Sequence, residues 1–419
     1  MNKFVVFVLL FCALACGTGT VAWSAPPAQS SSLRMVVVLS RHGVRSPTHP
    51  TELQAYASQP WPSWSGQQPG SLTAHGASLM RQFGAYYRRY YGGMLGLSER
   101  ACPPSGSVFV WADVDQRTKA TGEAIVQGFA PGCNITVGHA SSDNDALFDP
   151  LPGLGVVNKT EAKAAVLGAV GGSFSGMEEA YAPAFTTMEQ ILGCTSGRCK
   201  EISQVPTTVS NDGDGGLASL DGGFDMAGDV AENLLLEYTD GHAVVGWGRV
   251  DHSKLLTLLQ LHVLGKRLEH NRYAARAHSS NIMAHILQTL QQGATGKPVA
   301  GTRVPPQARF VFLSGHDTQL AELSTMLGLS WLAKGDQLND TPPGGALVFE
   351  LHQNAGGESF VRTFFTVQSL DAMRTGHGES PLRVPVYVPG CPALDCPLST
   401  FSGVVSAAIN TAFVSPWSP

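Results

Sequence analysis

Three short apolar segments, each followed directly by charged residues, constrain the fold of this chain most. They are residues 34–40 (RMVVVLS), 107–113 (SVFVWAD) and 309–315 (RFVFLSG). Apolar runs of this length that end at polar or glycine residues are typical of strands buried on both faces of a parallel sheet. A segment with helical character follows each run. We therefore predict an α/β fold with a mainly parallel central sheet flanked by helices.

The segments after the first and third strands carry the clearest helical signals. Apolar residues at helical spacing indicate one amphipathic helix within residues 72–91, and residues 317–329 indicate another. The apolar stripe predicted for the earlier helix consists of Leu79, Phe83, Tyr86 or Tyr87, and Tyr90. Asp317 and Thr318 are residue types favoured at an N-cap, so we predict that one of them caps the later helix.

The middle of the chain has a different pattern. Between residues 155 and 265, alanine- and leucine-rich stretches have helical spacing and few strand signals. We therefore predict an α/β domain formed by residues 26–154 and 266–419, with a smaller α-helical domain inserted at 155–265. The acidic, glycine-rich residues 211–225 lack the alternating ligands and terminal glutamate of an EF-hand loop, which favours a solvated loop over a calcium site.

The first 25 residues resemble an export signal. Lys3 precedes an apolar stretch from Phe4 to Cys16, and small residues follow it. This stretch is short for a membrane span and no other long uncharged run follows, so we expect a periplasmic or secreted protein without a membrane span. Lipidation at Cys16 is the alternative, because the residues before it loosely match a lipoprotein cleavage site.

Export gives the cysteines a structural meaning. The cysteines that follow the signal segment are Cys102, Cys133, Cys194, Cys199, Cys391 and Cys396. Two pairs are separated by only four residues, and local pairing leaves Cys102 with Cys133. A zinc site requires closely spaced Cys-x-x-Cys pairs or histidine partners, and the sequence has neither, so we predict three disulfides.

The overall charge limits the class of partner. The formal net charge is −5 at pH 7, with 43% hydrophobic and 14% charged residues. These values fit a globular protein and argue against a nucleic-acid-binding surface, which is expected to be basic. A site for an anion must therefore come from a local concentration of cationic side chains. We expect a monomer that acts on a small molecule.

The charged residues that follow the three strands meet at one edge of the predicted sheet. In open parallel sheets, ligands bind beyond the carboxyl ends of the strands. The residues placed there are Arg41, His42, Arg45 and Thr48, then Asp113, Asp115 and Arg117, and finally His316 and Asp317. Guanidinium groups bind phosphoryl oxygens bidentately and stabilise the charge spread over them in a transition state, so we predict a phosphoryl site.

Two of these residues have the chemistry of a nucleophile and an acid. Like charge from the arginines disfavours protonation of His42, so its pKa should fall below the free value of roughly 6.5. The neutral imidazole would then attack phosphorus and form a phosphohistidine. Asp317 would protonate the leaving alcohol, which predicts an acidic optimum, and this scheme needs no metal and no cofactor.

Each cluster taken alone has an ordinary explanation. Two arginines after a strand can form a surface salt-bridge cluster, His-Asp in a turn is usually a helix cap, and residues 112–118 resemble a solvated loop. Three such clusters, each directly after a predicted core strand, favour a functional site instead. The polar residues that we expect to be structural or on the surface are His75, Arg88, Arg89, His139, His262 and His285.

The sequence resembles the histidine acid phosphatases, and most closely their bacterial periplasmic phytases. The motifs that carry the resemblance are RHGVRSPT (41–48), ADVDQRTKATGEA (112–124), GWGR (246–249), HDT (316–318) and TPPGGALVFE (341–350). The three cysteine pairs fit the same pattern, and the similarity extends over residues 33–400. The resemblance implies an α/β domain and a smaller α-domain with the active site between them.

The resemblance also implies roles for individual residues. His42 matches the nucleophile of the family and Asp317 its proton donor. The matches to phosphate-binding positions are Arg41, Arg45, Arg117 and His316, and the matches to substrate-contacting positions are Thr48, Asp113, Arg276 and Thr318. Two residues depart from the phytase pattern: Gln319 stands where Asn is usual, and His49 where some members have Lys. We expect both at the pocket rim, where they would affect substrate preference.

These observations predict an exported acid phosphomonoesterase that hydrolyses phytate (myo-inositol hexakisphosphate) through a phosphohistidine. A glucose-1-phosphatase or broad-specificity acid phosphatase on the same scaffold is the alternative, because only Arg276 and His49 are candidates to bind further phosphates. A non-catalytic periplasmic binder of phosphate esters is a hypothesis from another class, but a binder needs neither His42 nor Asp317. A phosphoglycerate mutase shares the Arg-His-Gly start, but export and disulfides disfavour it.

Overall fold

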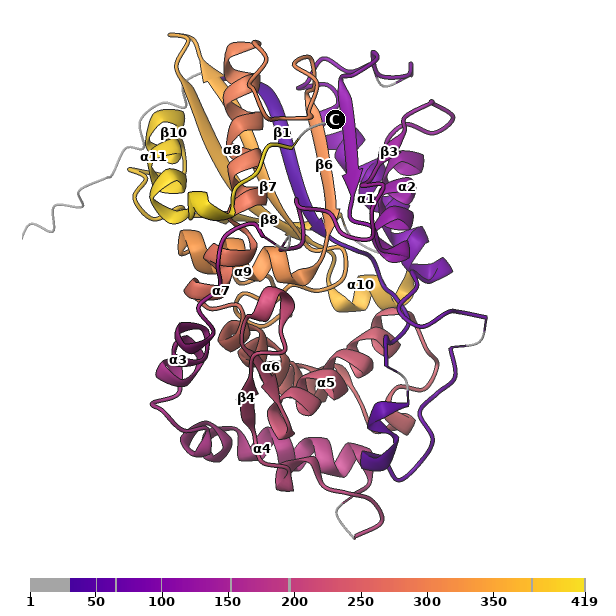
Figure 1. The fold of residues 1–419 in the computed structure, drawn as a ribbon. Helices are drawn as coiled ribbons and strands as arrows, with labels where there is room; N and C mark the ends of the chain where they lie inside the picture. The colour runs from indigo at the N-terminus through magenta and orange to yellow at the C-terminus, as the bar shows by residue number, and fades with distance from the viewer. Residues whose placement is uncertain are drawn as a thin grey trace, which may run out of the picture.

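A computed structural model describes residues 31–417, except residues 50, 65, 99, 151–152, 195–196 and 378–379. Within this part of the chain, an eight-stranded sheet with its flanking helices forms the upper part of the molecule in Figure 1, and a mainly helical part lies below. The strand order is β10-β8-β7-β1-β6-β2-β3, and β9 pairs with β8. A second sheet contains only β4 and β5.

The part of the sheet that carries the site consists of parallel strands. They are β1 (Ser31–Arg41), β6 (Phe310–Gly315), β2 (Val108–Ala112) and β3 (Val137–Gly138). Successive side chains of β1 point to opposite faces: Val36 and Val38 pack in one hydrophobic cluster, and Met35 and Val37 in another. Burial on both faces explains the continuous apolar runs, and the α/β fold with its parallel strands is confirmed.

Beyond β1 the sheet continues with antiparallel strands, for which the sequence pattern offers no separate signal. They are β7 (Ala346–Asn354), β8 (Ser359–Val367), β9 (Leu382–Val386) and β10 (Cys396–Pro397). β7 pairs with β1 from Ala346 opposite Ser40 to Asn354 opposite Ser31. Its first seven residues are buried, so β7 lacks the alternation that distinguishes most antiparallel strands.

Helices cover both faces of the sheet (Figure 1). One face is covered by α1 (Ala74–Tyr91) and α2 (Gln116–Phe129), and the other by α8 (Ser280–Thr295), α9 (Asp317–Leu327) and α11 (Leu398–Ala408). The stripe predicted for α1 is correct except at its end. Tyr91 is buried, whereas Tyr90 is 39% exposed, because one further residue turns the side chain back towards the sheet.

The lower part in Figure 1 is mainly helical. It contains α3 (Lys159–Ala169), α4 (Ser175–Leu192), α5 (Gly223–Thr239) and α6 (His252–Glu269), while α7 (Arg272–His278) and α10 (Leu370–Thr375) lie between the two parts. Leu234 and Leu258, from α5 and α6, are fully buried in its hydrophobic core. The domain boundary predicted at residue 265 falls inside α6, and the division into domains stays a prediction.

The acidic, glycine-rich residues 211–225 are not a solvated loop throughout, so that expectation is wrong. Residues 211–218 connect β4 (Thr208–Ser210) to its antiparallel partner β5 (Ser219–Asp221), and residues 223–225 lie in the first turn of α5. The hydroxyl groups of the paired residues Ser210 and Ser219 are 2.9 Å apart. Strands of three mainly polar residues have no apolar alternation, so sequence periodicity does not reveal them.

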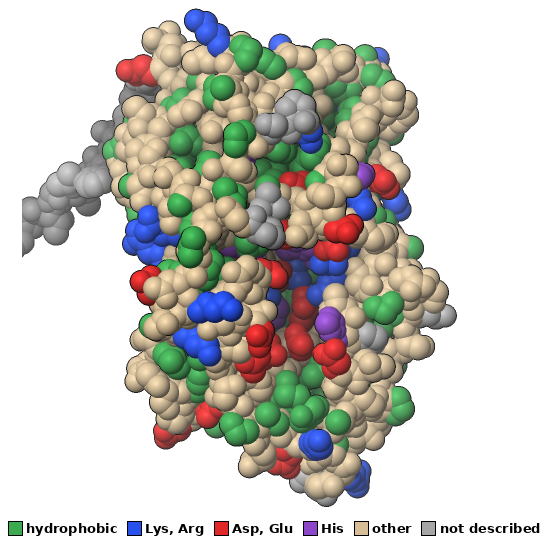
Figure 2. All heavy atoms as spheres, in the orientation of Figure 1, with side chains coloured by type: hydrophobic (Ala, Val, Ile, Leu, Met, Phe, Trp, Pro, Cys, Tyr) green, Lys and Arg blue, Asp and Glu red, His purple; other side chains and the backbone are tan. Residues whose placement is uncertain are grey.

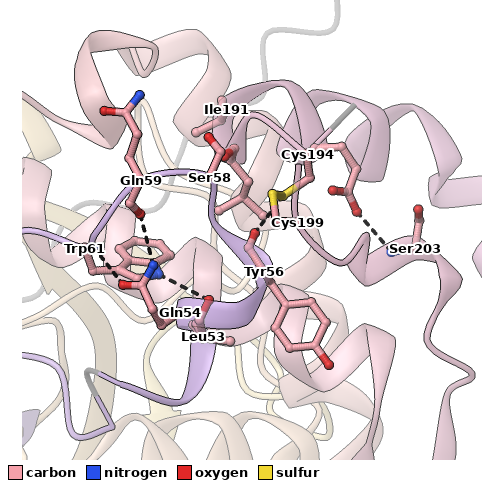
Figure 3. The surroundings of a disulfide bond; sticks show 12 residues. Leu53, Gln54, Tyr56, Ser58, Gln59, Trp61, Ile191, Cys194, Cys199 and Ser203 are labelled. Atoms are coloured by element: carbon pink, nitrogen blue, oxygen red, sulfur yellow. Dashed lines mark hydrogen bonds between the residues drawn. A yellow bond between two sulfur atoms is a disulfide. The ribbon is translucent and has the colours of Figure 1, made fainter. Parts of the chain in front are cut away.

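Residues 53–58, which lie between β1 and α1 in the sequence, pack against the helical part beside the disulfide Cys194–Cys199 (Figure 3). Ser58 donates two hydrogen bonds to the carbonyl oxygen of Leu192, from its amide (2.9 Å) and from its hydroxyl (2.8 Å). The Sγ atom of Cys194 lies 3.0 Å from the carbonyl oxygen of Tyr56. Leu53 packs in the same hydrophobic core as Leu192. This segment therefore belongs with the helical part in space, although it is distant in sequence.

The six cysteines beyond the signal segment form three disulfides. They are Cys102–Cys133, Cys194–Cys199 and Cys391–Cys396, the pairing that their spacing favours. The first bond joins residues 31 positions apart, and the other two join residues 5 positions apart. A longer closed loop removes more conformational entropy from the unfolded chain, so the first bond should stabilise the fold most.

We expect the double variant Cys102→Ser/Cys133→Ser to lower the free energy of unfolding by about 4 kcal/mol, against about 2 kcal/mol for Cys194→Ser/Cys199→Ser. The difference follows from the sequence separations of 31 and 5 residues. Urea denaturation of both variants and the wild type under non-reducing conditions measures it. A larger loss from the shorter loop would contradict the entropic explanation.

Two predictions about the N-terminus concern residues outside the described range. The export signal at residues 1–25 and the alternative of lipidation at Cys16 both lie there. Among the residues that the structure describes, no helix is long and apolar enough to cross a bilayer.

Candidate active site

The carboxyl ends of the parallel strands open into a cavity of about 760 Å³. Arg41, the last residue of β1, pairs with Gly315, the last residue of β6, so His42 and His316 follow at the same edge of the sheet. Figure 2 shows a hollow between the two parts of the molecule where basic, acidic and histidine side chains gather. The predicted residues that line the cavity are His42, Arg45, Asp113, Asp115, Arg117, His316, Asp317 and Thr318.

His42 is buried and neutral. Its Nδ1 atom is 2.8 Å from the carbonyl oxygen of Gly43. A carbonyl oxygen only accepts, so we assign the proton to Nδ1, which leaves the lone pair on Nε2. Burial first, and then the charges of Arg41, Arg117 and Arg45, hold the pKa of His42 well below its ordinary value. The sequence predicts the direction of this shift, but burial contributes more to it than like charge.

Three arginines supply the positive charge of the site. Arg41 donates from Nη1 to the carbonyl oxygen of Thr341 (2.8 Å), and Arg117 pairs through Nη2 with Asp115 (2.7 Å). The Nε atoms of Arg41, Arg45 and Arg117 are buried, and none has a hydrogen-bond partner among the described residues. A buried donor without an acceptor costs about 1–3 kcal/mol. Arg45 and Arg117 line the cavity, where their guanidinium groups offer positive charge to an oxyanion.

Glu232 is a site residue that sequence reasoning missed. It lies on α5 and accepts from Nη2 of Arg41 and, at 3.0 Å, from Nη2 of Arg45. Burial alone would raise the pKa of Glu232, but the charges of Arg45 and Arg41 outweigh it and lower this pKa to about 2. Glu232 therefore stays ionised and fixes both guanidinium groups. Its surroundings in the sequence, AENLLLEY, predict only a helix, so no local signal identifies it.

Asp317 lies among three basic side chains. Its Oδ2 atom is 3.8 Å from Nη2 of Arg41, 3.8 Å from Nζ of Lys266 and 3.9 Å from Nε2 of His262. Burial would raise the pKa of Asp317, but the charges of Lys266, Arg41 and His262 outweigh it and hold this pKa well below the ordinary value. His262 is buried, which fits the expectation of a structural residue, although α6 brings its ring close to Asp317.

A carboxylate held in its ionised form must gain a proton before it acts as an acid. In the unliganded site, the surrounding cations favour the carboxylate of Asp317. The phosphoryl group of a bound monoester brings negative charge beside Asp317, and like charge raises the pKa of a carboxyl group. Binding of the substrate therefore favours the protonated form of Asp317 at the moment when a leaving group needs a proton.

His316 is the N-cap of α9, so the prediction of Asp317 or Thr318 at this position is wrong. Its Nε2 atom lies 2.7 Å from Oδ2 of Asp113, and its amide donates to Oε1 of Gln319 at 2.8 Å. Nη2 of Arg117 is 3.5 Å from its Nδ1 atom. Asp113 therefore orients His316. That Asp113 also contacts the substrate directly stays a prediction.

The two residues that depart from the phytase pattern lie in different places. Gln319 borders the cavity but is only 1% exposed, and its Nε2 donates to the carbonyl oxygen of Phe148 at 2.9 Å. Both the oxygen and the nitrogen of its side-chain amide thus form hydrogen bonds within the protein. The expectation that Gln319 lies at the pocket rim is therefore wrong. His49 is exposed, and its Nδ1 is 3.0 Å from Glu52.

The predicted substrate-contacting residues are only partly brought together. Thr318 lines the cavity, whereas Thr48 is exposed and is not part of its lining. Arg276 lines a separate cavity and its Nη2 donates to the carbonyl oxygen of Ile409, so the structure contradicts its placement at the site. His278, two residues further along α7, lines the cavity instead. Residues two apart on a helix point to different sides.

Two groups of side chains bring metal-binding atom types close together. They are Asp113, Asp115 and His316, and Glu232, His262 and Asp317. Arginines already bind the carboxylates of Glu232 and Asp115, and Lys266 lies beside Asp317. The fixed cations thus offset the negative charge that a metal ion would otherwise balance. The expectation that the reaction needs no metal and no cofactor stays a prediction.

The chain is similar to histidine phosphatases both in sequence and in structure. A profile of the histidine phosphatase superfamily (branch 2) matches residues 32–215 and 225–366. Phytase AppA of Escherichia coli (strain K12) is 32% identical over 403 residues, covering 90% of this chain and 92% of that protein. Glucose-1-phosphatase of Providencia rettgeri is 25% identical over 401 residues, with 90% and 92% covered. Hafnia alvei phytase in complex with tartrate superposes with a TM-score of 0.86 at 32% identity, covering 93% of this chain and 100% of that chain.

Proposed function

Because the chain belongs to branch 2 of the histidine phosphatase superfamily, we propose that it is an exported acid phosphomonoesterase that hydrolyses phytate through a covalent phosphohistidine. The observation that carries this proposal is the buried His42, whose Nδ1 contacts the carbonyl oxygen of Gly43 and whose pKa is held well below its ordinary value beside Arg41, Arg45 and Arg117. The fold agrees with this family, and its relatives of known structure include phytases.

In the first step, Nε2 of His42 attacks the phosphorus of the monoester. The bond between phosphorus and the ester oxygen breaks, and its electron pair goes to that oxygen, which takes a proton from Asp317. An alcohol leaves, and the phosphoryl group remains on His42. Arg41, Arg45 and Arg117 stabilise the negative charge of the phosphoryl oxygens throughout.

In the second step, water takes the place of the alcohol. The carboxylate of Asp317 accepts a proton from this water, whose oxygen attacks phosphorus. The bond between phosphorus and Nε2 of His42 breaks, the electron pair returns to the nitrogen, and inorganic phosphate leaves. Asp317 is protonated again at the end, so one carboxyl group serves both steps.

Two features support phytate as the substrate. The cavity volume of about 760 Å³ exceeds what a single phosphoryl group requires. His278 adds a cation to its wall beyond the arginines: burial alone would lower the pKa of His278, but the charge of Glu322, 2.7 Å from its Nδ1, outweighs burial and raises it. A protonated His278 suits a further phosphate of an inositol ring.

A specific observation favours a second candidate, a glucose-1-phosphatase. Three further acidic residues of the cavity lining, Asp143, Asp149 and Asp214, form an acidic wall, whereas Asp115 is paired with Arg117. Within the described lining, Arg45 and Arg117 are the only Lys or Arg residues. A substrate with one phosphate and a neutral sugar experiences less repulsion from this wall than a substrate with six phosphates.

We expect kcat/KM at pH 4.5 to be at least about tenfold higher for phytate than for glucose 1-phosphate, the difference that one charge-assisted hydrogen bond supplies. Burial and the charge of Asp113 raise the pKa of Asp149 to about 6, so the wall loses negative charge as pH falls through that value. The ratio of the two kcat/KM values should therefore rise in acid. A strong preference for glucose 1-phosphate at every pH would overturn the phytate proposal and support the second candidate.

Several parts of the proposal rest on the sequence alone. Export to the periplasm or medium rests on the signal segment and fits the three disulfides. A monomeric state, and a lipid anchor at Cys16 as the alternative to simple release, stay predictions. A non-catalytic binder of phosphate esters would bind phosphate without turning over any monoester, which the activity assay above distinguishes.

A further inference from the structure

A second cavity adjoins the candidate active site. It has a volume of about 470 Å³ and is lined by residues of α6, α7, α9 and the segment 328–341. Lys266 and His262 line this second cavity, whereas Asp317 lines the larger one. The Nζ atom of Lys266 is 3.8 Å from Oδ2 of Asp317, so this ion pair lies at the boundary between the two cavities.

Lys266 differs from the other cations around Asp317 in its partners. Arg41 also binds Glu232, so its charge is shared between two carboxylates. Burial lowers the pKa of His262, which favours its neutral form. Lys266 has Asp317 as its only salt-bridge partner within the described part of the chain, and its side chain is 32% exposed. Its charge is therefore present, and its closest contact with an acidic group in the described part of the chain is with Asp317.

We propose that Lys266 is a positioning residue, which holds the carboxyl group of Asp317 from the second cavity and sets the pH range over which that group donates its proton. This inference rests on the proposed phosphomonoesterase function. Lys266 does not line the cavity that contains His42, so it acts through Asp317 and not by touching the phosphoryl group. It also links the helical part to the edge of the sheet, because α6 carries it to the first residue of α9.

The charge of Lys266 has a definite effect on the proton of Asp317. A cation close to a carboxyl group stabilises the carboxylate, so the proton is lost at a lower pH. Among its charged neighbours, Lys266 lowers the pKa of Asp317 most. The other charged or titratable groups that face this pair are Arg41, His42, Arg117, Asp225, Asp229, Glu232, His262, Glu269 and Asp340. A Lys266 variant leaves all of these in place and changes one charge.

The test is the pH dependence of kcat in Lys266→Met, with glycerol 2-phosphate as a substrate whose alkyl leaving group needs an acid. Without the cation, Asp317 keeps its proton to a higher pH, so the alkaline limb of the kcat profile should move up by about 1 pH unit. Lys266→Arg keeps the charge and should return the limb towards its wild-type position. Arg267→Met removes the adjacent, exposed charge of the same helix and should leave the limb unchanged.

An alkaline limb that stays in place in Lys266→Met overturns the proposal, whatever the value of kcat, because a merely structural role does not move a titration. An increase in KM without a shift of the limb identifies Lys266 as a substrate contact and overturns it too. If Lys266→Met does not fold, Lys266→Gln is measured and interpreted in the same way. Failure of the proposed function is separate, because it appears as a wild-type protein without hydrolysis or as hydrolysis that persists without His42.

Discussion

Replacement of His42 by alanine should lower kcat for every phosphate monoester by at least about 10⁴-fold, a loss on the scale known for catalytic nucleophiles. The imidazole is only 2% exposed, and its Nδ1 is 2.8 Å from the carbonyl oxygen of Gly43, so a single nitrogen, Nε2, is available for attack. The other two described histidines of the cavity differ: Nε2 of His316 contacts Asp113, and the contact of His278 with Glu322 raises the pKa of His278, which favours its protonated form.

The measurement combines steady-state kinetics with trapping of the phosphoenzyme. Wild-type protein mixed with labelled substrate and quenched in alkali should retain label, because a phosphohistidine is stable to alkali, and His42→Ala should retain none. His139→Ala is a matched control, because Nδ1 of His139 makes the same contact, 2.7 Å from the carbonyl oxygen of the following Ala140. His139 is not part of the cavity lining, so its variant should keep wild-type kcat and label.

Hydrolysis that persists in His42→Ala would show that water attacks the substrate directly and that the nucleophile is assigned wrongly. A different outcome, binding of inorganic phosphate without hydrolysis by the wild type, would support the phosphate-ester-binding hypothesis. The three arginines would then hold an anion that is not transformed. The two outcomes are distinct, since only the second leaves the wild-type protein inactive.

The site residues that directly follow strands were predictable from sequence. A continuous apolar run marks each buried parallel strand, and the residues after it lie at the carboxyl edge of the sheet. Arg41 and His42 come directly after one buried run and His316 after another, and parallel strands bring their carboxyl ends to one edge. The direction of the pKa shift of His42 was predictable for the same reason, since like charges sit close to it in sequence. The main cause of the shift is the burial of His42, which depends on tertiary packing that a local sequence pattern does not reveal.

The residues that reach the site from the helical part were not predictable in the same way. Glu232, His262 and Lys266 lie on α5 and α6, in runs whose spacing indicates helices and nothing more. Their approach to Arg41 and Asp317 depends on how these helices pack beneath the sheet, which is a matter of tertiary contacts. Each is a charged or titratable residue in a mainly apolar helix, a weak signal that also fits a solvated face.

Misplaced residues show where resemblance alone is insufficient. Arg276 was assigned to the site from a short, weakly similar segment, but α7 directs it to a separate cavity and His278 to the site. Gln319 is buried and bonded on both sides, so its substitution for Asn changes how His316 is held rather than what the substrate meets. We therefore expect substrate preference to depend more on His278 and the acidic wall than on Gln319.

Replacement of Asp317 by asparagine should lower kcat by about 10³-fold for phytate and glycerol 2-phosphate, within the range that general acid catalysis contributes. Asparagine retains the shape of the side chain but has no proton to give to an alkyl leaving group. With p-nitrophenyl phosphate the first step should be much less affected, because p-nitrophenolate leaves readily without protonation. The second step still lacks a base for the attacking water.

These two effects together predict that Asp317→Asn accumulates phosphohistidine on His42 when the substrate is p-nitrophenyl phosphate. Rapid mixing should therefore show a burst of p-nitrophenolate that approaches one equivalent per site, followed by slow turnover, and the alkali-stable label should increase over the wild type. Asp143→Asn, an exposed carboxyl group of the same cavity, removes the same charge without a role in proton transfer and should show neither effect. If Asp317→Asn loses activity equally on both leaving groups and forms no burst, another group donates the proton. The ion pair with Lys266 would then serve to hold the helical part against the sheet.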